Sequence, residues 1–232
     1  MLANSIHYNN LEVIETGYGI SLRPLSIFAN EVYKDCDTHR FAVKLTGADA
    51  DQYTEKDKLL SARMHKAITV IQFKLEGEII RRRPEFEMDD RMLLHHIDLK
   101  RGVVHIDGKD YTLKDTNWPT LDPKDPYRLS IEEEDLIRKI LHSFESSEKM
   151  KKHMRCFFRH GGMYQVCNSN LLFHASIPMN PDGTFKSVRI LGQDYKGRAL
   201  LDRVDQLIRT AYFKTGEQEE VEYAHDYIWY LW

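Results

Sequence analysis

A chain of 232 residues, of which 42% are hydrophobic and 30% charged, has the composition of an ordinary globular protein with one large domain or two small ones. The net charge of −3 excludes the strongly basic surface of a nucleic-acid-binding protein, so we expect no nucleic-acid partner. No apolar run approaches the roughly 20 residues that span a bilayer, and the N-terminus has no leader pattern. We therefore expect a cytoplasmic protein with no membrane partner.

The first third of the chain is predicted to be mainly helical. Residues 1–35 are typical of helix and are interrupted by two glycines in residues 16–19. Residues 36–53 are small and polar and predict a loop. Thr54 and Asp57 form a loose capping box, and a long helix is predicted to follow until Pro84 removes a backbone donor. Its apolar stripe consists of Leu60, Met64, Ala67, Ile68, Ile71, Leu75 and Ile79.

The middle of the chain mixes helix and strand signals. A short helix is predicted over residues 90–97, followed by a hairpin around Asp107 and Gly108. Three prolines place residues 116–127 in a loop. Ser130 and Glu133 form a capping box that begins another helical region, which ends near Gly161 with a break around residues 146–147.

Short strands are concentrated in the last third of the chain. Strands are predicted over residues 163–167, 171–173 and 185–190, and an amphipathic helix over residues 197–213. The fold class is therefore α+β, rich in helices and with few strands. We find no internal repeat, and the three widely spaced cysteines, at positions 36, 156 and 167, predict reduced thiols.

His174 is the most informative candidate for a functional residue. It follows an apolar strand, predicted to be buried, and precedes Ala175, Ser176 and Pro178. Such a strand fixes the backbone, and small residues leave room for an ion or a substrate. A neutral imidazole suits manganese, iron or zinc. On this pattern alone, the alternative is a histidine that caps a strand and bonds to a nearby carbonyl.

Other candidates have a competing structural interpretation. Arg81, Arg82 and Arg83 could bind a phosphate through their guanidinium groups, or could stabilise the C-terminus of the preceding helix. His95 and His96 are adjacent, so on a helix their side chains diverge by about 100° and rarely share one ion.

Two further pairs of side chains are candidates for a site. His153 and His160 lie seven residues apart on a basic helix, where surface or packing roles are the favoured interpretation. Cys167 and His174 could form a nucleophile pair, but no oxyanion-forming turn accompanies them.

Two sets of residues resemble known families. Residues 166–174 resemble a metal-ligand motif of calcineurin-like metallophosphatases, although Ala175 and Ser176 replace the glycines that usually follow the histidine. Further stretches, in this order, resemble the middle of class 3 fructose-1,6-bisphosphatase along essentially the whole chain. They are residues 17–25, 67–76, 82–91 and 229–232.

The resemblance implies a manganese-dependent, dinuclear phosphatase that converts fructose 1,6-bisphosphate to fructose 6-phosphate and phosphate in gluconeogenesis, with His174 as one metal ligand. It also implies that residues 1–232 form part of a metallophosphatase β-sandwich, with a large helical insertion over residues 36–160. The family's Asp-x-His, Gly-Asp-x-x-Asp-Arg-Gly, Gly-Asn-His-Asp and Gly-His-Thr motifs do not occur in this sequence.

The missing motifs lead us to expect that the chain is an internal fragment and is inactive in isolation, because one histidine cannot hold two divalent cations. A half-present sheet exposes backbone donors and apolar surface, which predicts homo-oligomers. Two alternatives stay open: a non-catalytic helical module in protein interaction or regulation, and a metallophosphatase for another phosphate ester.

Overall fold

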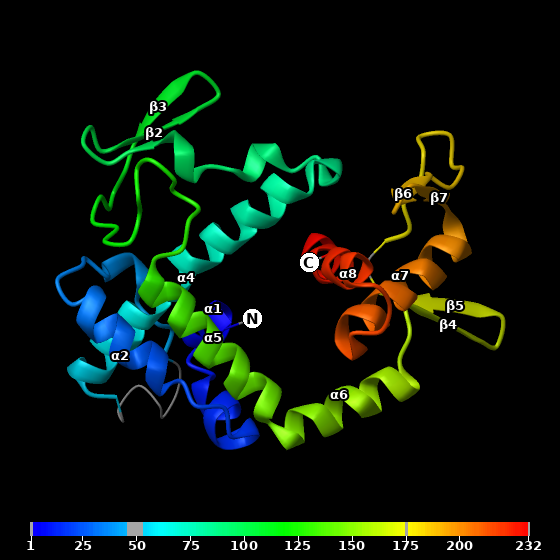
Figure 1. Cartoon of the computed structure of the whole chain (residues 1–232), viewed down its shortest axis with the longest axis horizontal. Helices are drawn as coiled ribbons and strands as arrows, with labels where there is room; N and C mark the ends of the chain where they lie inside the picture. Colours follow the sequence, from blue (N-terminus) through cyan, green and yellow to red (C-terminus); the bar gives the residue numbers. More distant parts are fainter. Residues whose placement is uncertain (1, 46–52, 175, 232) are drawn as a thin grey trace. The chain divides into compact units, whose positions relative to one another are not determined.

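The computed structural model describes residues 2–45, 53–174 and 176–231, and it divides into two compact units, Met1–Lys151 and Lys152–Trp232 (Figure 1). Part of the predicted loop, residues 46–52, lies outside the described residues. No helix in the described ranges is both long and apolar enough to cross a membrane.

The first unit is built mainly from helices. A π-helical turn over Val13–Gly17 leads into the predicted interruption, and Gly19, with φ of 67°, lies outside any helix, which confirms the break there. The 3₁₀ turn His39–Phe41 lies in the described part of the predicted loop. The helices are α1 (Leu2–His7), α2 (Arg23–Val32), α4 (Glu55–Arg82), α5 (Ile131–Ser146) and the start of α6 (Glu148–His160).

The long helix α4 begins and ends as predicted. The Thr54 hydroxyl accepts a bond from the Asp57 backbone N–H at 3.3 Å, and the Asp57 carboxylate accepts one from the Thr54 N–H at 3.0 Å. These two bonds satisfy N–H groups that the first turn leaves unpaired. The apolar stripe of α4 packs against α1 and α2. Leu75, which is exposed, and Ile79, which is half-buried, lie outside this core.

Between α4 and α5 the chain forms turns and a small sheet. The strands β1 (Ile97–Asp98), β2 (Val103–Ile106) and β3 (Lys109–Thr112) are antiparallel in the order β1-β2-β3. The predicted hairpin is confirmed: Ile106 pairs with Lys109, and both turn residues have positive φ, 49° at Asp107 and 75° at Gly108.

The predicted helix over residues 90–97 is wrong. Two separate 3₁₀ turns, Asp89–Arg91 and Leu94–His96, occupy this segment. Met92 between them has ψ of 74°, which breaks a helix, and the Leu94 N–H donates to the Tyr127 hydroxyl at 3.0 Å instead of to a helical carbonyl. A tertiary contact has therefore replaced the local one.

Tyr127 fills the space beside a helical glycine. Its side chain is buried against Gly77 of α4, where an added Cβ would lie 1.9 Å from Cδ1 of the ring. The Arg81 guanidinium, one turn further along α4, lies 4.7 Å from the ring centroid. The absence of a side chain at position 77 thus lets the proline-rich segment approach the helix closely.

Two buried lysines of α4 bind residues from distant parts of the first unit. Lys74 Nζ lies 2.7 Å from Glu133 Oε2 and donates to the Thr120 carbonyl at 2.6 Å. Lys66 Nζ lies 2.6 Å from Asp115 Oδ2 and donates to the Asp37 carbonyl at 3.0 Å. Both lysine side chains are fully buried, so each charge depends on these partners.

The α5 helix begins with the predicted capping box. The Ser130 hydroxyl accepts from the Glu133 N–H at 3.2 Å, and Glu133 Oε2 accepts from the Ser130 N–H at 2.8 Å. The predicted break before α6 is confirmed at Ser147, whose hydroxyl donates to the Tyr18 carbonyl at 2.6 Å.

The second unit combines two helices with two-stranded hairpins. Its core contains Ile190, Leu200, Val204 and Leu207, and the α7 boundaries match the prediction. The last helix was not predicted, and the strand expected over residues 185–190 is confirmed only for its final three residues. The elements are β4 (Tyr164–Cys167), β5 (Asn170–Phe173), β6 (Val188–Ile190), β7 (Gln193–Tyr195), α7 (Gly197–Phe213) and α8 (Gln218–Leu231).

The described elements mix helices with three small antiparallel sheets. The metallophosphatase β-sandwich and the helical insertion over residues 36–160 stay predictions, since the division after Lys151 tests neither.

His65 makes the stability of the first unit sensitive to mild acid. Its Nδ1 donates to the Phe41 carbonyl at 3.0 Å, and burial, with a smaller effect of His7, lowers its pKa despite this carbonyl. A folded-state pKa below the unfolded value of 6.5 means that the unfolded chain binds the proton more tightly. His65 therefore contributes full stability above that value and loses it as the pH falls through its lower folded-state pKa.

We expect the free energy of unfolding to fall between pH 7 and pH 5, and His65→Gln to reduce that fall, because glutamine can donate to the carbonyl without titrating. Urea unfolding at each pH measures the effect. His142→Gln, at an exposed position of α5, is the control. An unchanged pH dependence in His65→Gln would contradict the assignment.

Candidate functional site

The β4–β5 hairpin carries the candidate metal ligand. Cys167 pairs with Asn170, and Asn168 and Ser169 form the turn with φ of 50° and 63°. The two predicted strands are thus confirmed, and His174 follows β5 directly.

The expectation of a buried strand before His174 is wrong for this chain. Leu172 is 53% exposed, and Leu171 and Phe173 are also exposed. The cause is the size of the sheet: β4 and β5 pair only with each other among the described strands, so most of both faces stay accessible. His174 is exposed as well.

A cleft of about 1000 Å³ lies beside this hairpin, within the second unit. Both His160, the last residue of α6, and His174 line it. Ala175, between two lining residues, lies outside the described residues. The lining residues are Phe157, His160, Gly161, Gly162, Met163, Tyr164, Gln165, Leu172, Phe173, His174, Ser176, Leu201 and Leu231.

Arg209 of α7 holds the end of α6 that carries His160. Its guanidinium donates to the Phe158 carbonyl at 2.6 Å and to the Gly161 carbonyl at 3.1 Å, and its Nε lies 2.7 Å from Asp205 Oδ2. These carbonyls flank His160 in sequence and belong to the turn that a helix leaves without internal partners. The Asp205 carboxylate raises the pKa of Arg209, so the clamp stays charged.

The described residues of this chain do not form a metal site by themselves. Within residues 2–45, 53–174 and 176–231, no three His, Cys, Asp or Glu side chains gather as a metal site requires. His174 is thus at most one ligand, and the chain supplies an incomplete donor set for the expected metal.

The three arginines lie in the first unit. Arg81 Nη1 binds both Glu78 and Asp125 at 2.9 Å. Burial lowers the pKa of Arg81, but Asp125 and Glu78 outweigh it and raise the pKa. The Arg81 guanidinium therefore makes structural contacts with these two carboxylates. Arg82 is exposed and Arg83 half-buried, and their binding of substrate phosphate stays a prediction.

The remaining sequence candidates do not form a site in the described chain. The rings of His95 and His96 are 4.0 Å apart on a 3₁₀ turn, and burial, then His96 and Arg81, lower the pKa of His95. Neither Cys167 nor His153 lines the cleft. His160 does line the cleft. The surface or packing role favoured for it from the sequence therefore did not reveal the cavity that it shares with His174. The signal that could have shown this is the helix end at Gly161 followed at once by a strand.

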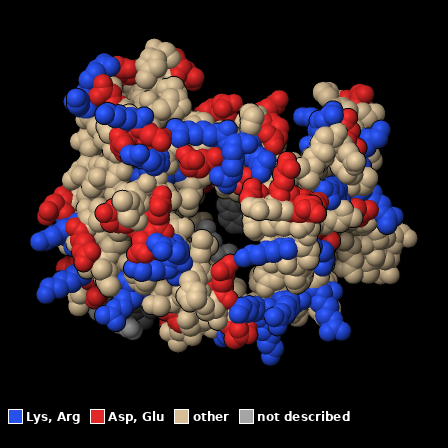
Figure 2. Space-filling model, viewed as in Figure 1, with Lys and Arg blue, Asp and Glu red and all other residues tan. Residues whose placement is uncertain are grey.

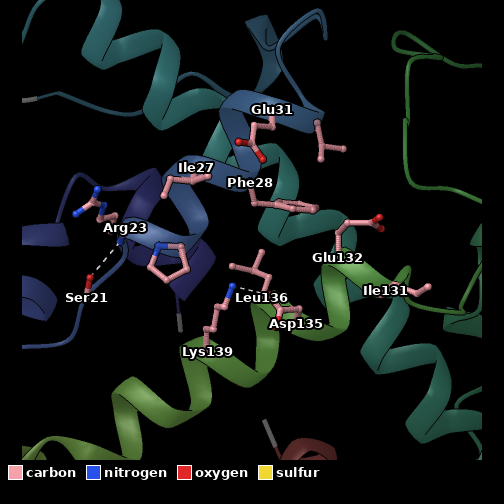
Figure 3. Close-up of a pocket in the computed structure, with 12 residues that line it drawn as sticks. Ser21, Arg23, Ile27, Phe28, Glu31, Ile131, Glu132, Asp135, Leu136 and Lys139 are labelled. Carbon is pink, nitrogen blue, oxygen red and sulfur yellow. Dashed lines mark hydrogen bonds and ion pairs between the residues drawn. The ribbon is translucent and has the colours of Figure 1, made fainter.

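A second cavity, of about 590 Å³, lies between α2 and α5 (Figure 3). Ile27, Phe28 and Leu136 supply its apolar wall, and Asp135 pairs with Lys139 at its rim. No histidine or cysteine occurs among the described residues that line it, so this cavity offers neither an imidazole nor a thiolate ligand for a metal.

Comparison with known proteins assigns the chain to a class. The family model of the Firmicute fructose-1,6-bisphosphatases matches residues 1–232. The chain therefore belongs to this fructose-1,6-bisphosphatase family.

The particular relatives are named class 3 fructose-1,6-bisphosphatase. The protein of Parabacteroides distasonis is 84% identical over 227 residues, which are 98% of this chain and 34% of the relative. Those of Bacteroides fragilis and Clostridioides difficile are 59% and 48% identical over 228 residues, again 98% of this chain and 34% of the relative. The chain thus spans about a third of the length of these relatives. No solved structure matches it.

Proposed function

We propose that the whole protein hydrolyses fructose 1,6-bisphosphate to fructose 6-phosphate and phosphate. The observation that supports this function is the family match along the entire chain, together with 84% identity to a relative named for the activity. Because the chain spans only about a third of such relatives, its isolated form is expected to lack the activity.

His174 is the contribution of this chain to the proposed metal centre. It lies exposed in an open cleft at the end of β5, where an imidazole is accessible to an ion. Manganese is the proposed metal, and its remaining ligands come from parts of the whole protein that this chain does not contain.

The exposed β4–β5 hairpin fits the proposal that it is part of a larger sheet in a metallophosphatase β-sandwich, because unpaired strands and exposed apolar residues favour further pairing. The same surface would favour homo-oligomers of the isolated chain. Cytoplasmic localisation is proposed from the metabolic role.

We expect His174→Ala in the whole protein to reduce phosphate release from fructose 1,6-bisphosphate with manganese by about 100-fold or more, since even indirect partners of metal ligands change activity by 10–100-fold. Phosphate release and the manganese bound per chain, measured after gel filtration, test this together. The isolated 232-residue chain is expected to release no phosphate above background.

His142→Ala, on the exposed face of α5, provides a matched control and should leave both measurements unchanged. Full manganese content in His174→Ala would show that this histidine is not a ligand. Chelator-sensitive activity in the 232-residue chain would show that the site is complete without the rest of the protein.

A further inference from the structure

We propose that His160 binds a phosphate group of the sugar phosphate in the cleft that it shares with His174. This inference rests on the proposed function, which it deepens by assigning a substrate contact to a residue outside the metal centre.

The position of His160 is fixed by the structure around it. The Arg209 clamp holds the carbonyls on either side of it, and the helix ends immediately afterwards. A Cβ at Gly161 would lie 2.7 Å from the Phe157 carbonyl oxygen, so glycine is needed where the chain leaves α6 for β4. His160 thus stands on a rigid helix end, and the cleft lies between it and the hairpin.

The chemistry of the lining favours an anion. Among the described residues that line the cleft there is no carboxylate, whereas His160, Gln165 and Ser176 all offer hydrogen-bond donors. The nearby acids already have partners: Asp202 accepts from the Tyr164 hydroxyl at 3.0 Å, and Asp205 binds Arg209. A phosphate needs several donors and no competing negative charge, and this cleft provides that combination.

The rest of the lining suits the body of a sugar. Phe157, Leu172 and Phe173 present exposed apolar surface to the cleft. The C–H face of a furanose ring can pack on such side chains while its phosphate reaches the donors. The part of α6 that belongs to the second unit carries Lys152, Arg155 and Arg159 and no acidic residue, and Figure 2 shows Lys and Arg side chains gathered over this helix. Their positive charge raises the local concentration of anions.

Titration of the metal-free 232-residue chain with inorganic phosphate, followed by the imidazole NMR signals, tests the contact directly. We expect saturable shifts of the His160 signals, and about tenfold weaker binding in His160→Ala. Fructose 6-phosphate should produce the same shifts, and fructose should produce none. The control His153→Ala lies seven residues earlier on α6 and outside the cleft, and it should bind phosphate like the original chain.

Kinetics of the whole protein separate this inference from the proposed function. We expect His160→Ala to raise KM for fructose 1,6-bisphosphate about tenfold with unchanged manganese content, whereas His174→Ala loses manganese. No saturable shift at His160, or equal phosphate affinity in His160→Ala, would overturn the phosphate contact even if the whole protein is active. If phosphate binds at His160 but the whole protein does not hydrolyse the bisphosphate, the proposed function is rejected and the phosphate contact stands.

Discussion

Gly77→Ala is expected to destabilise the first unit by about 3 kcal/mol or more, although alanine is the better helix former. The added methyl group would lie 1.9 Å from the Tyr127 ring, well inside contact distance. The ring cannot withdraw without loss of its bond to the Leu94 N–H and its contact with Arg81. Helix propensity alone predicts the opposite sign, a gain of about 1 kcal/mol.

The Tyr127→Ala background provides the decisive control. Without the ring, Gly77→Ala should be neutral or stabilising, so the sign of its effect reverses between the two backgrounds. Urea unfolding followed by circular dichroism gives both values, and Gln72→Ala on the exposed side of α4 should change stability little. The same destabilisation in both backgrounds would show that the tyrosine is not its cause.

Lys74→Met should cost about 3–5 kcal/mol of unfolding free energy, because it leaves the Glu133 carboxylate buried without its counter-ion. Both side chains of the pair are fully buried, and Glu133 Oε1 has no hydrogen-bond partner among the described residues. The substitution also removes the donor that binds the Thr120 carbonyl.

The double variant Lys74→Met with Glu133→Gln should recover most of the loss, since glutamine is neutral and can still accept from the Ser130 N–H. Lys58→Met breaks an exposed pair with Glu55 on the same helix and should cost less than about 1 kcal/mol. Equal losses in Lys74→Met and Lys58→Met would show that burial does not govern the strength of these pairs.

Local signals in the sequence were enough to predict much of the secondary structure. The two capping boxes, the Asp107–Gly108 turn and the amphipathic pattern of residues 197–213 each depend on residues a few positions apart, and all are confirmed. The short helix over residues 90–97 was predicted wrongly because the competing partner of the Leu94 N–H, Tyr127, lies 33 residues away.

Long-range contacts also explain what the sequence did not reveal about the candidate site. His174 and its hairpin could be found from a local pattern, but the shared cleft depends on how α6, β5 and the later helices meet. The burial of Lys66 and Lys74 likewise has no local signal, since their carboxylate partners at positions 115 and 133 lie far along the chain.

The two bonds of the Glu133 carboxylate have a consequence for the order of folding. The same oxygen, Oε2, closes the first turn of α5 and binds Lys74, 59 residues earlier in the chain. Helix initiation at this point and docking onto α4 are therefore linked through one carboxylate. Docking closes a long loop and has an entropic cost, and the first turn of a helix is also unfavourable to form alone. We expect α5 to become fully helical as it docks onto α4, because the same oxygen takes part in both contacts.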